Sequence, residues 1–288
     1  MRAIEQRLNG GTLGQGVAAT LLAVVPFVAL VVLLWWALAR VHPALGFAVN
    51  VAVLYSLMGF RRFSHAVSTI IAALRMNDLP TARRALAAWR GGWTAELSSH
   101  DLARLTIERG LVDAYREVFA VVFWFLVLPG PAGAALYRLS ELLAEEWASE
   151  PVPGDATPLA RERLVFGQPA RQLLWLLDWV PVRLTALSFA VVGDFEDSVY
   201  CWRTQPSRWP ASAGGEPMGI LLASGAGAVG VEIGGALPTL AEPEERPVMG
   251  MGEPADAELL PSAVGLTWRA LVLWMLLTLL LTLANWAP

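Results

Sequence analysis

Carboxylates and arginines are interspersed along one stretch of the chain that we expect to be helical. Glu108, Asp113 and Glu117 occur there together with Arg109 and Arg116. Asp113 and Glu117 stand four residues apart and share one helix face, whereas Asp113 and Arg116 can pair at a spacing of three. A solvated, salt-bridged helix explains this pattern. The alternative is a magnesium or phosphate site at a membrane surface, since carboxylate oxygens are suitable ligands for magnesium.

A second set of ionisable residues lies within the apolar run from Leu173 to Val192. Asp178 and Arg183 flank the stretch Trp179-Val180-Pro181. A charge at the centre of a bilayer costs about 2.5–3.5 kcal/mol on insertion scales. We therefore expect both side chains to lie at an interface or to face a protein interior. A structural ion pair that positions a helix and a functional role both remain open.

Glycines are concentrated in one segment of the second half of the chain. The run Gly225-Ala226-Gly227-Ala228-Val229-Gly230 fits the G-x-G-x-x-G pattern, which in dinucleotide-binding proteins follows a strand and opens a helix. Here Gly234-Gly235 and Pro238 follow in place of a helix and a second strand. Close backbone packing is the favoured interpretation, and cofactor binding is the alternative. The glycines that could contact a cofactor are Gly227, Gly230, Gly234 and Gly235.

Several chemistries are excluded by residue type. All 21 basic residues are arginine, so a Walker A loop, a pyridoxal-phosphate site and a protein-kinase site, each of which needs a lysine, cannot be built. The three histidines stand far apart in the sequence and Cys201 is the single cysteine, so we expect no zinc site and no internal disulfide bond. A formal net charge of −4 argues against nucleic-acid binding.

The composition is typical of an all-α, multi-pass membrane protein. Apolar residues make up 56% of the 288 residues and charged residues 16%. The apolar run Val17–Ala39 is long enough to span a bilayer at a rise of about 1.5 Å per residue. A second run, Ala44–Phe60, follows the short link Arg40–Pro43. We therefore predict a transmembrane hairpin over residues 17–60.

The segment 61–117 is predicted to be a cytoplasmic helical insert. It contains nine arginines, which place it on the cytoplasmic side by the positive-inside rule. We expect two helical pieces in it. Asp78 is expected to cap a helix that Gly91 ends, and Ser98 with Asp101 is expected to form a capping box that opens another. This arginine-rich segment is also the candidate docking surface for a protein partner.

Residues 118–235 are predicted to form broken and glycine-rich membrane segments. Pro129–Gly133 interrupts an apolar run, which implies a kinked span or a re-entrant hairpin. Residues 149–169 and 236–265 are rich in turn-forming or acidic residues and are expected to be loops. A final transmembrane helix is predicted over residues 266–286. The chain is thus expected to form a single membrane domain with four to five transmembrane or re-entrant helices.

Family membership is indicated by a series of stretches in order along the chain. They are Arg40–Gly46, Leu74–Leu79 with Ala82-Arg83, Phe123-Trp124, Leu136–Arg138, Asp178–Leu184, Gly227–Gly235 and Arg246–Gly250. Together, over about residues 17–275, they resemble the CobD/CbiB family of cobalamin-biosynthesis membrane proteins. The stretch Asp178–Leu184 also resembles the AmpE inner-membrane proteins.

The resemblance implies an activity and a set of site residues. Members of the CobD/CbiB family are associated with adenosylcobinamide-phosphate synthesis, in which an aminopropanol moiety is joined to an acid side chain of cobyric acid with ATP and magnesium. By this resemblance Glu108 and Asp113 would hold magnesium, and Arg183 would bind a phosphate or a carboxylate. Asp178 is a further candidate catalytic residue. The resemblance also implies a corrinoid substrate and a location in the bacterial inner membrane.

Two functions stay open at this point. Five polar motifs of the family are altered in this chain, while its glycines, prolines and aromatic residues match. One function is an amide-forming ligase of the adenosylcobinamide-phosphate synthase type. The other is an AmpE-like, non-catalytic regulatory or sensor protein, in which residues 61–117 would contact a partner.

Overall fold

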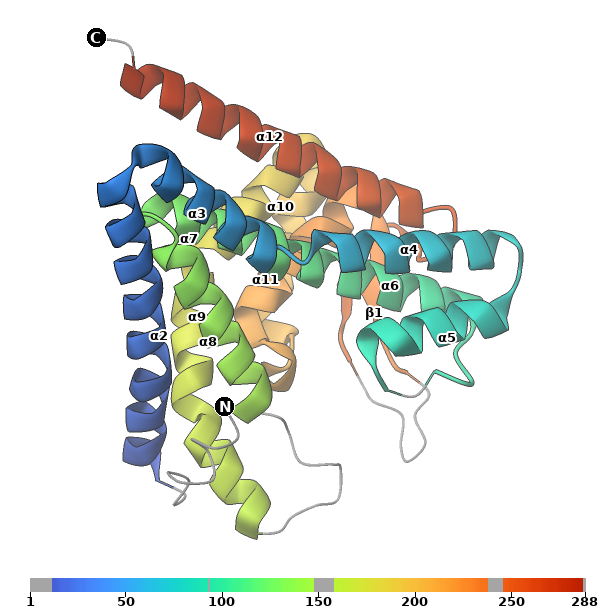
Figure 1. Ribbon diagram of the computed structural model, residues 1–288. Helices are drawn as coiled ribbons and strands as arrows, with labels where there is room; N and C mark the ends of the chain where they lie inside the picture. The colour runs from blue at the N-terminus through green and yellow to red at the C-terminus, as the bar shows by residue number, and fades with distance from the viewer. Residues whose placement is uncertain (1–11, 93, 148–157, 238–245, 287–288) are drawn as a thin grey trace. The chain divides into compact units, whose positions relative to one another are not determined.

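A computed structural model describes residues 12–92, 94–147, 158–237 and 246–286. It confirms the all-α class, because helices build most of the described chain and a small sheet is the only addition to them there (Figure 1). The chain forms two compact units. The first unit comprises Met1–Met58 and Ala120–Pro181, and the second comprises Gly59–Phe119 and Val182–Pro288.

The first unit begins with a helical hairpin. Its helices are α2 (Leu13–Val41), α3 (Pro43–Leu57), α7 (Ala120–Val127), α8 (Ala132–Trp147) and the first part of α9 (Pro158–Val192). His42 ends α2 and caps α3, because its Nδ1 accepts a hydrogen bond from the backbone N–H of Ala44. Pro43 occupies the first turn of α3, where its missing N–H is not needed. The two helices predicted within residues 17–60 are therefore present.

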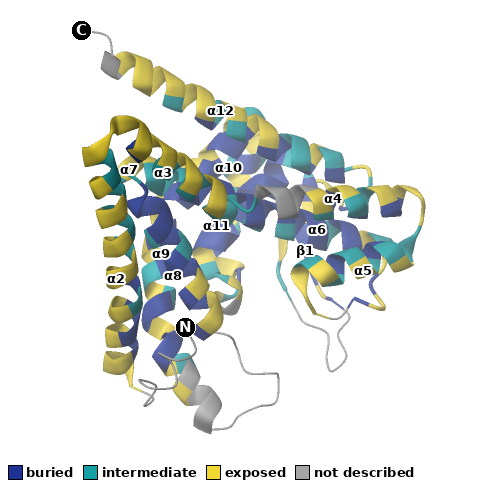
Figure 2. Ribbon diagram, in the orientation of Figure 1, coloured by how far each residue is buried: buried dark blue, intermediate teal, exposed yellow. Residues whose placement is uncertain are grey.

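The core of the first unit lies where α2 packs against α8 and α9. Its buried residues are Ala19, Val24, Leu139, Leu143, Trp147, Phe166 and Ala170. Only one narrow face of α2 is buried, and most of α2 and α3 is exposed (Figure 2). An apolar helix that exposes most of its surface is expected to face lipid.

The interruption predicted at Pro129–Gly133 is confirmed. Helix α7 ends at Val127 and α8 begins at Ala132, so the two helices form a hairpin and pack against each other. Their approach is close at Gly133, where a Cβ would lie 1.8 Å from the carbonyl oxygen of Trp124. Glycine is therefore required at this crossing.

The second unit holds the arginine-rich segment in three helices rather than two. They are α4 (Phe60–Arg75), α5 (Leu79–Arg90) and α6 (Ser99–Ala114), and a π-helical turn, Tyr115–Phe119, follows. Asn77, at φ +55°, separates α4 from α5. The expected caps are confirmed: Asp78 accepts from the N–H of Thr81 at 3.1 Å, and Ser98 forms a capping box with Asp101.

The remaining α-helices of the second unit are α10 (Phe195–Thr204), α11 (Gly215–Val229), α12 (Leu260–Trp286) and the last part of α9. Two short 3-10 helices, Pro206–Arg208 and Ala211–Ala213, lie between α10 and α11 in the sequence. Helix α11 is almost fully buried, and α6, α10 and α12 pack against it. Figure 2 shows α11 in dark blue and much of α12 in yellow. The glycine-rich segment thus forms the centre of this unit.

A short sheet corrects the loop predicted over residues 236–265. Strand β1 (Val231–Gly234) lies between β2 (Val248–Gly250) and β3 (Glu253–Pro254), antiparallel to β2 and parallel to β3. Strands of two or three residues leave no periodicity to recognise in a sequence. Helix α12 begins within this range at Leu260. The glutamates at 242, 244 and 245 lie outside the described residues.

The loop predicted over residues 149–169 is also corrected. Helix α9 starts at Pro158 and continues through Pro169 and Pro181. Proline is tolerated in the first turn of a helix, and a helix that packs against neighbours can continue past an internal proline. Residues 158–169 are therefore helical rather than a loop, and residues 149–157 of the predicted loop lie outside the described residues.

Three helices in the described part of the chain are long and apolar enough to cross a membrane. They are Leu13–Val41, Leu164–Val192 and Leu260–Ala284, with mean hydropathies of 2.9, 1.4 and 1.9. The shorter helix Pro43–Leu57 is also apolar. These segments are typical of a membrane protein.

Candidate functional site

Glu108 lies at the centre of a buried polar cluster in the second unit. Its Oε2 lies 2.7 Å from Nη1 of Arg246, and its Oε1 accepts from Nη2 of Arg246 at 3.3 Å and from the backbone N–H of Gly234 at 2.8 Å. The side chains of Arg246 and Glu108 are 6% and 9% exposed. Both oxygens of the Glu108 carboxylate therefore have hydrogen-bond donors at a site that is almost fully shielded from solvent.

Arg104 extends this cluster along α6. It stands one helical turn before Glu108 and donates to the carbonyl oxygens of Gly234 and Ala236. Its guanidinium also forms an ion pair with Asp101 at 2.7 Å. Two side chains of α6 thus bind the last residue of β1: Glu108 accepts from the N–H of Gly234, and Arg104 donates to its carbonyl oxygen.

Strand β2 is held at both ends by side chains. Before its start, Arg246 pairs with Glu108 and lies over the ring of Trp209, 5.8 Å from the centroid. At its end, the Gln205 amide donates to the carbonyl oxygen of Gly250 at 2.9 Å and accepts from its N–H at 2.7 Å. A three-residue strand is thereby fixed from two sides.

Asp113 has partners of its own in the second unit. It is buried, forms an ion pair with Arg109 at 2.8 Å and accepts from the indole N–H of Trp89 at 2.9 Å. Burial raises the pKa of Asp113 above its usual value, and the Arg109 guanidinium opposes this shift. The ion pair expected on this helix is present, with Arg109 as the partner of Asp113. The helix is not the solvated one that the sequence predicts, because Glu108 and Asp113 are both buried.

Asp178 lies in the first unit, within the candidate membrane span of α9. It is buried, and the hydroxyl of Tyr137 on α8 donates to its Oδ1 at 2.8 Å. One residue earlier, the carbonyl oxygen of Leu177 accepts from the indole N–H of Trp124 at 3.1 Å. The protein-facing location predicted for Asp178 is therefore confirmed.

Arg183 belongs to the second unit and lies near Glu216 at the start of α11. The distance between Nη2 of Arg183 and Oε1 of Glu216 is 3.6 Å, and the side chain of Glu216 is more than half exposed. Exposed pairs of this kind contribute about 0–1 kcal/mol. Asp178 and Arg183 share helix α9, but these contacts involve different partners.

The candidate glycines occur in the order helix, turn, strand. Gly227 lies inside α11, where a Cβ would be 2.7 Å from the carbonyl oxygen of Asp197, and Gly230 ends the helix at φ +75°. A dinucleotide fingerprint has the reverse order, in which a strand precedes the glycines and a helix follows. Gly234, at φ +79°, is the last residue of β1, and Gly235, at φ +76°, follows it, so the chain turns at the end of this strand. For Gly227 and Gly234 the close neighbours are protein backbone.

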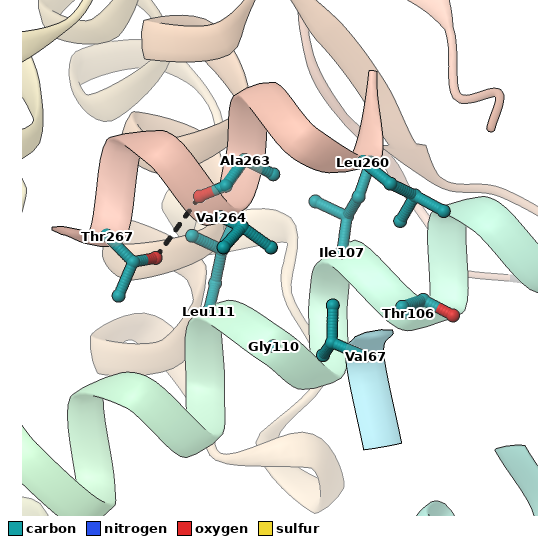
Figure 3. A pocket seen from close by; sticks show the side chains of 9 residues that line it. All are labelled: Val67, Thr106, Ile107, Gly110, Leu111, Leu260, Ala263, Val264 and Thr267. Atoms are coloured by element: carbon teal, nitrogen blue, oxygen red, sulfur yellow. Dashed lines mark hydrogen bonds between the residues drawn. The ribbon is translucent and has the colours of Figure 1, made fainter. Parts of the chain in front are cut away.

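A small cavity lies between α4, α6 and α12 in the second unit (Figure 3). It is lined by Val67, Thr106, Ile107, Gly110, Leu111, Leu260, Ala263, Val264 and Thr267. Its volume is about 10 Å³, close to the minimum for one water molecule. The hydroxyls of Thr106 and Thr267 donate to carbonyls of their own helices. This cavity is therefore a packing defect rather than a substrate site.

The described residues do not fit the magnesium site that the resemblance implies. Among them, no group of three or more His, Cys, Asp or Glu could hold a metal ion. Glu108 is paired with Arg246, and Asp113 with Arg109 and Trp89. A magnesium ion needs oxygen ligands with free lone pairs in nearly octahedral geometry.

Part of the arginine-rich segment is used for internal contacts. Arg83 donates twice to the carbonyl oxygen of Leu97, at 2.8 and 3.0 Å, and Arg104 and Arg109 contact groups on or beside α6. The docking of a protein partner on residues 61–117 stays a prediction.

Five residues with contacts in these clusters are not singled out as site residues by the sequence pattern: Arg104, Arg246, Tyr137, Trp124 and Gln205. A signal existed for Arg246, because it is a single arginine in an acidic, proline-rich stretch. Tyr137 and Trp124 stand in stretches that carry the family resemblance. Arg104 is one helical turn from Glu108, a spacing typical of side chains that act on the same neighbour.

The comparisons with known proteins identify the family of this chain. The model of the CobD/Cbib protein family matches residues 1–267. The cobalamin biosynthesis protein CobD of Stutzerimonas stutzeri is 34% identical, over 96% of this chain and 86% of its own length. The CobD protein of Chromobacterium violaceum is 38% identical, over 92% and 79%.

A more distant relative carries a name of the same family. The cobalamin biosynthesis protein CbiB of Salmonella typhimurium is 25% identical over 85% of this chain and 72% of its own length. No solved structure matches the chain. The names of these relatives favour the CobD/CbiB interpretation, and nothing in the comparisons favours the AmpE-like alternative. The chain belongs to the CobD/Cbib protein family.

Proposed function

We propose that this protein acts in cobalamin biosynthesis as a membrane-bound, amide-forming ligase that joins an aminopropanol moiety to an acid side chain of cobyric acid. The observation that carries the proposal is the family match over residues 1–267, with two CobD relatives at 34% and 38% identity. Residues of several stretches that resemble the family lie in two buried polar clusters: Gly234 and Arg246 contact Glu108, and Tyr137 contacts Asp178.

The proposed reaction is balanced by the hydrolysis of ATP. The amine nitrogen of aminopropanol forms a C–N bond with the carboxyl carbon of cobyric acid. One carboxyl C–O bond breaks, and its oxygen leaves on the phosphate released as ATP becomes ADP. Among the described residues no group of three or more His, Cys, Asp or Glu could hold a metal ion, so we assign no step to magnesium. Their contribution is to position the turn after β1 and the helix around Asp178.

A multi-pass location in the bacterial inner membrane is part of this proposal. Three apolar helices long enough to span a bilayer support it, and so does the wide exposed surface of α2. The arginine-rich segment 61–117 would then lie on the cytoplasmic side, where ATP is available.

Complementation tests the proposal. The full chain is expressed in a bacterium that lacks its own cobinamide-phosphate synthase, and growth is scored with cobyric acid as the only corrinoid. Growth with cobyric acid is the expected result. Cobinamide, which already carries the amide, is the control for the later steps. Growth on cobinamide but not on cobyric acid, with the chain detected in the membrane fraction, would contradict the proposal.

A further inference from the structure

We infer that Glu108 is a positioning residue for the turn at Gly234 and Gly235, and that it is not a metal ligand. This inference rests on the proposed function in one respect: the proposed reaction uses magnesium, so a buried glutamate is a candidate ligand for that ion. The observations that carry it are the contacts of the Glu108 side chain.

The first observation is that α6 binds both backbone groups of Gly234. Glu108 accepts from the Gly234 N–H at 2.8 Å, and Arg104 donates to the Gly234 carbonyl. Gly234 has φ +79°, and a Cβ there would lie 2.0 Å from the carbonyl oxygen of Pro247. Glycine is therefore required, and a glycine backbone has wide conformational freedom unless something restricts it. The two α6 side chains supply that restriction.

The second observation is the pairing of Glu108 with Arg246. The guanidinium contacts both carboxylate oxygens, at 2.7 and 3.3 Å, and both side chains are at least nine-tenths buried. A paired, buried carboxylate is stable only while its cation stays in place. A magnesium ion at Glu108 would displace Arg246 and leave the guanidinium buried without its carboxylate. Among the described residues it would also find no group of three or more His, Cys, Asp or Glu that could hold it.

The third observation concerns the sheet. Gly234 lies opposite Val248 in the register of β1 and β2, and Arg246 is two residues before Val248. Glu108 therefore connects α6 to the neighbouring ends of both strands. Loss of its carboxylate is expected to release the turn and the start of β2 together.

A metal titration separates the two roles. The full chain in detergent is titrated with Mn²⁺ alone, and free Mn²⁺ is followed by electron paramagnetic resonance. A positioning role predicts that the isotherm of Glu108→Gln coincides with that of the wild type within about twofold. A loss of affinity of tenfold or more in Glu108→Gln, with wild-type backbone exchange at Gly234, would overturn the inference.

Hydrogen exchange of the peptide that contains Gly234 tests the positioning itself. Glu108→Ala and Arg246→Ala are each expected to accelerate exchange of this peptide at least tenfold. Glu108→Gln is expected to retain most of the protection, because its amide oxygen can still accept from the Gly234 N–H. Glu232→Gln, at an exposed position on the same strand, is the matched control and should not change the exchange.

Unchanged exchange in both Glu108→Ala and Arg246→Ala would overturn the inference. Neither readout needs a corrinoid substrate. A failure of complementation with the exchange pattern as expected would therefore contradict the proposed function and leave the role of Glu108 intact.

Discussion

The indole N–H of Trp124 donates a 3.1 Å hydrogen bond to the carbonyl oxygen of Leu177. That oxygen is the one that Pro181, four residues later in α9, leaves without a backbone donor. In a helix apolar enough to span a membrane, no solvent can supply the missing bond. A tryptophan from the neighbouring helix α7 therefore makes the proline tolerable, and both residues belong to stretches that carry the family resemblance.

Trp124→Phe is expected to lower the free energy of unfolding by about 1–3 kcal/mol, because the Leu177 carbonyl loses its donor. Pro181→Ala returns a backbone N–H to that carbonyl. In the Pro181→Ala background the effect of Trp124→Phe should therefore shrink, and chemical unfolding in detergent measures both differences. The same loss in both backgrounds would show that the indole acts through packing alone.

Tyr137→Phe removes the hydroxyl that donates to the buried Asp178. We expect a loss of about 1–3 kcal/mol in unfolding free energy, because the carboxylate is left with one donor fewer. Asp178→Asn should cost less, since an amide oxygen still accepts from Tyr137. Tyr200→Phe, at an exposed tyrosine, is the control and should change stability by less than about 0.5 kcal/mol. Equal effects of the two tyrosine variants would contradict this account.

Two glycines on α2 provide a matched pair. A Cβ at Gly16 would lie 2.4 Å from the carbonyl oxygen of Phe166, whereas a Cβ at Gly14 would have nothing within 4 Å. Gly16→Ala is therefore expected to destabilise the protein by about 1–3 kcal/mol through overpacking. Gly14→Ala should be neutral or stabilising by up to about 1 kcal/mol, because alanine favours the helix. Thermal unfolding in detergent measures both, and a neutral Gly16→Ala would mean that α2 does not pack here.

Cys201 is the single cysteine, which makes its chemistry simple to follow. Burial, and then the nearby Asp197 carboxylate, raise the pKa of the Cys201 thiol to about 11. At pH 8 only about one thiol in a thousand is then ionised, so alkylation of the folded protein should be slow and should accelerate on unfolding. Mass spectrometry of the alkylated chain measures both rates. Equal rates for folded and unfolded protein would contradict the burial of this thiol.

The raised pKa of Cys201 also makes the stability of the protein depend on pH. Because the folded pKa lies above the unfolded value, the contribution of Cys201 is fully present below the unfolded pKa and is lost as pH rises through about 11. Cys201→Ser should flatten the fall in stability over this range. If stability depends on pH in the same way in Cys201→Ser, other groups cause its decrease at high pH.

The features that the sequence predicted are mostly local. The caps at Asp78 and Ser98 depend on residues at most three positions away, and the break at Pro129–Gly133 follows from proline and glycine alone. The apolar runs likewise mark α2 and α12 without reference to the rest of the chain. Such features can be predicted because the residues that interact lie only a few positions apart in the sequence.

The candidate site depends on contacts that no short window contains. Glu108 and Arg246 are 138 residues apart, and the strands that bring them together are three or four residues long. The magnesium role of Glu108 is implied by the family resemblance, whereas the partner of its carboxylate is set by tertiary packing. The sequence predicts a later start for helix α9, because Pro158 and Pro169 favour a loop.

The most direct test of the central claim is the proposed ligation itself. Membranes that contain the full chain are incubated with cobyric acid, aminopropanol or its phosphate, ATP and magnesium, and the corrinoids are separated and weighed by mass spectrometry. We expect a product whose mass equals the sum of acid and amine less one water, formed only with ATP and absent from membranes without the chain. Cobyric acid recovered unchanged, with the folded chain present and ATP intact, would contradict it.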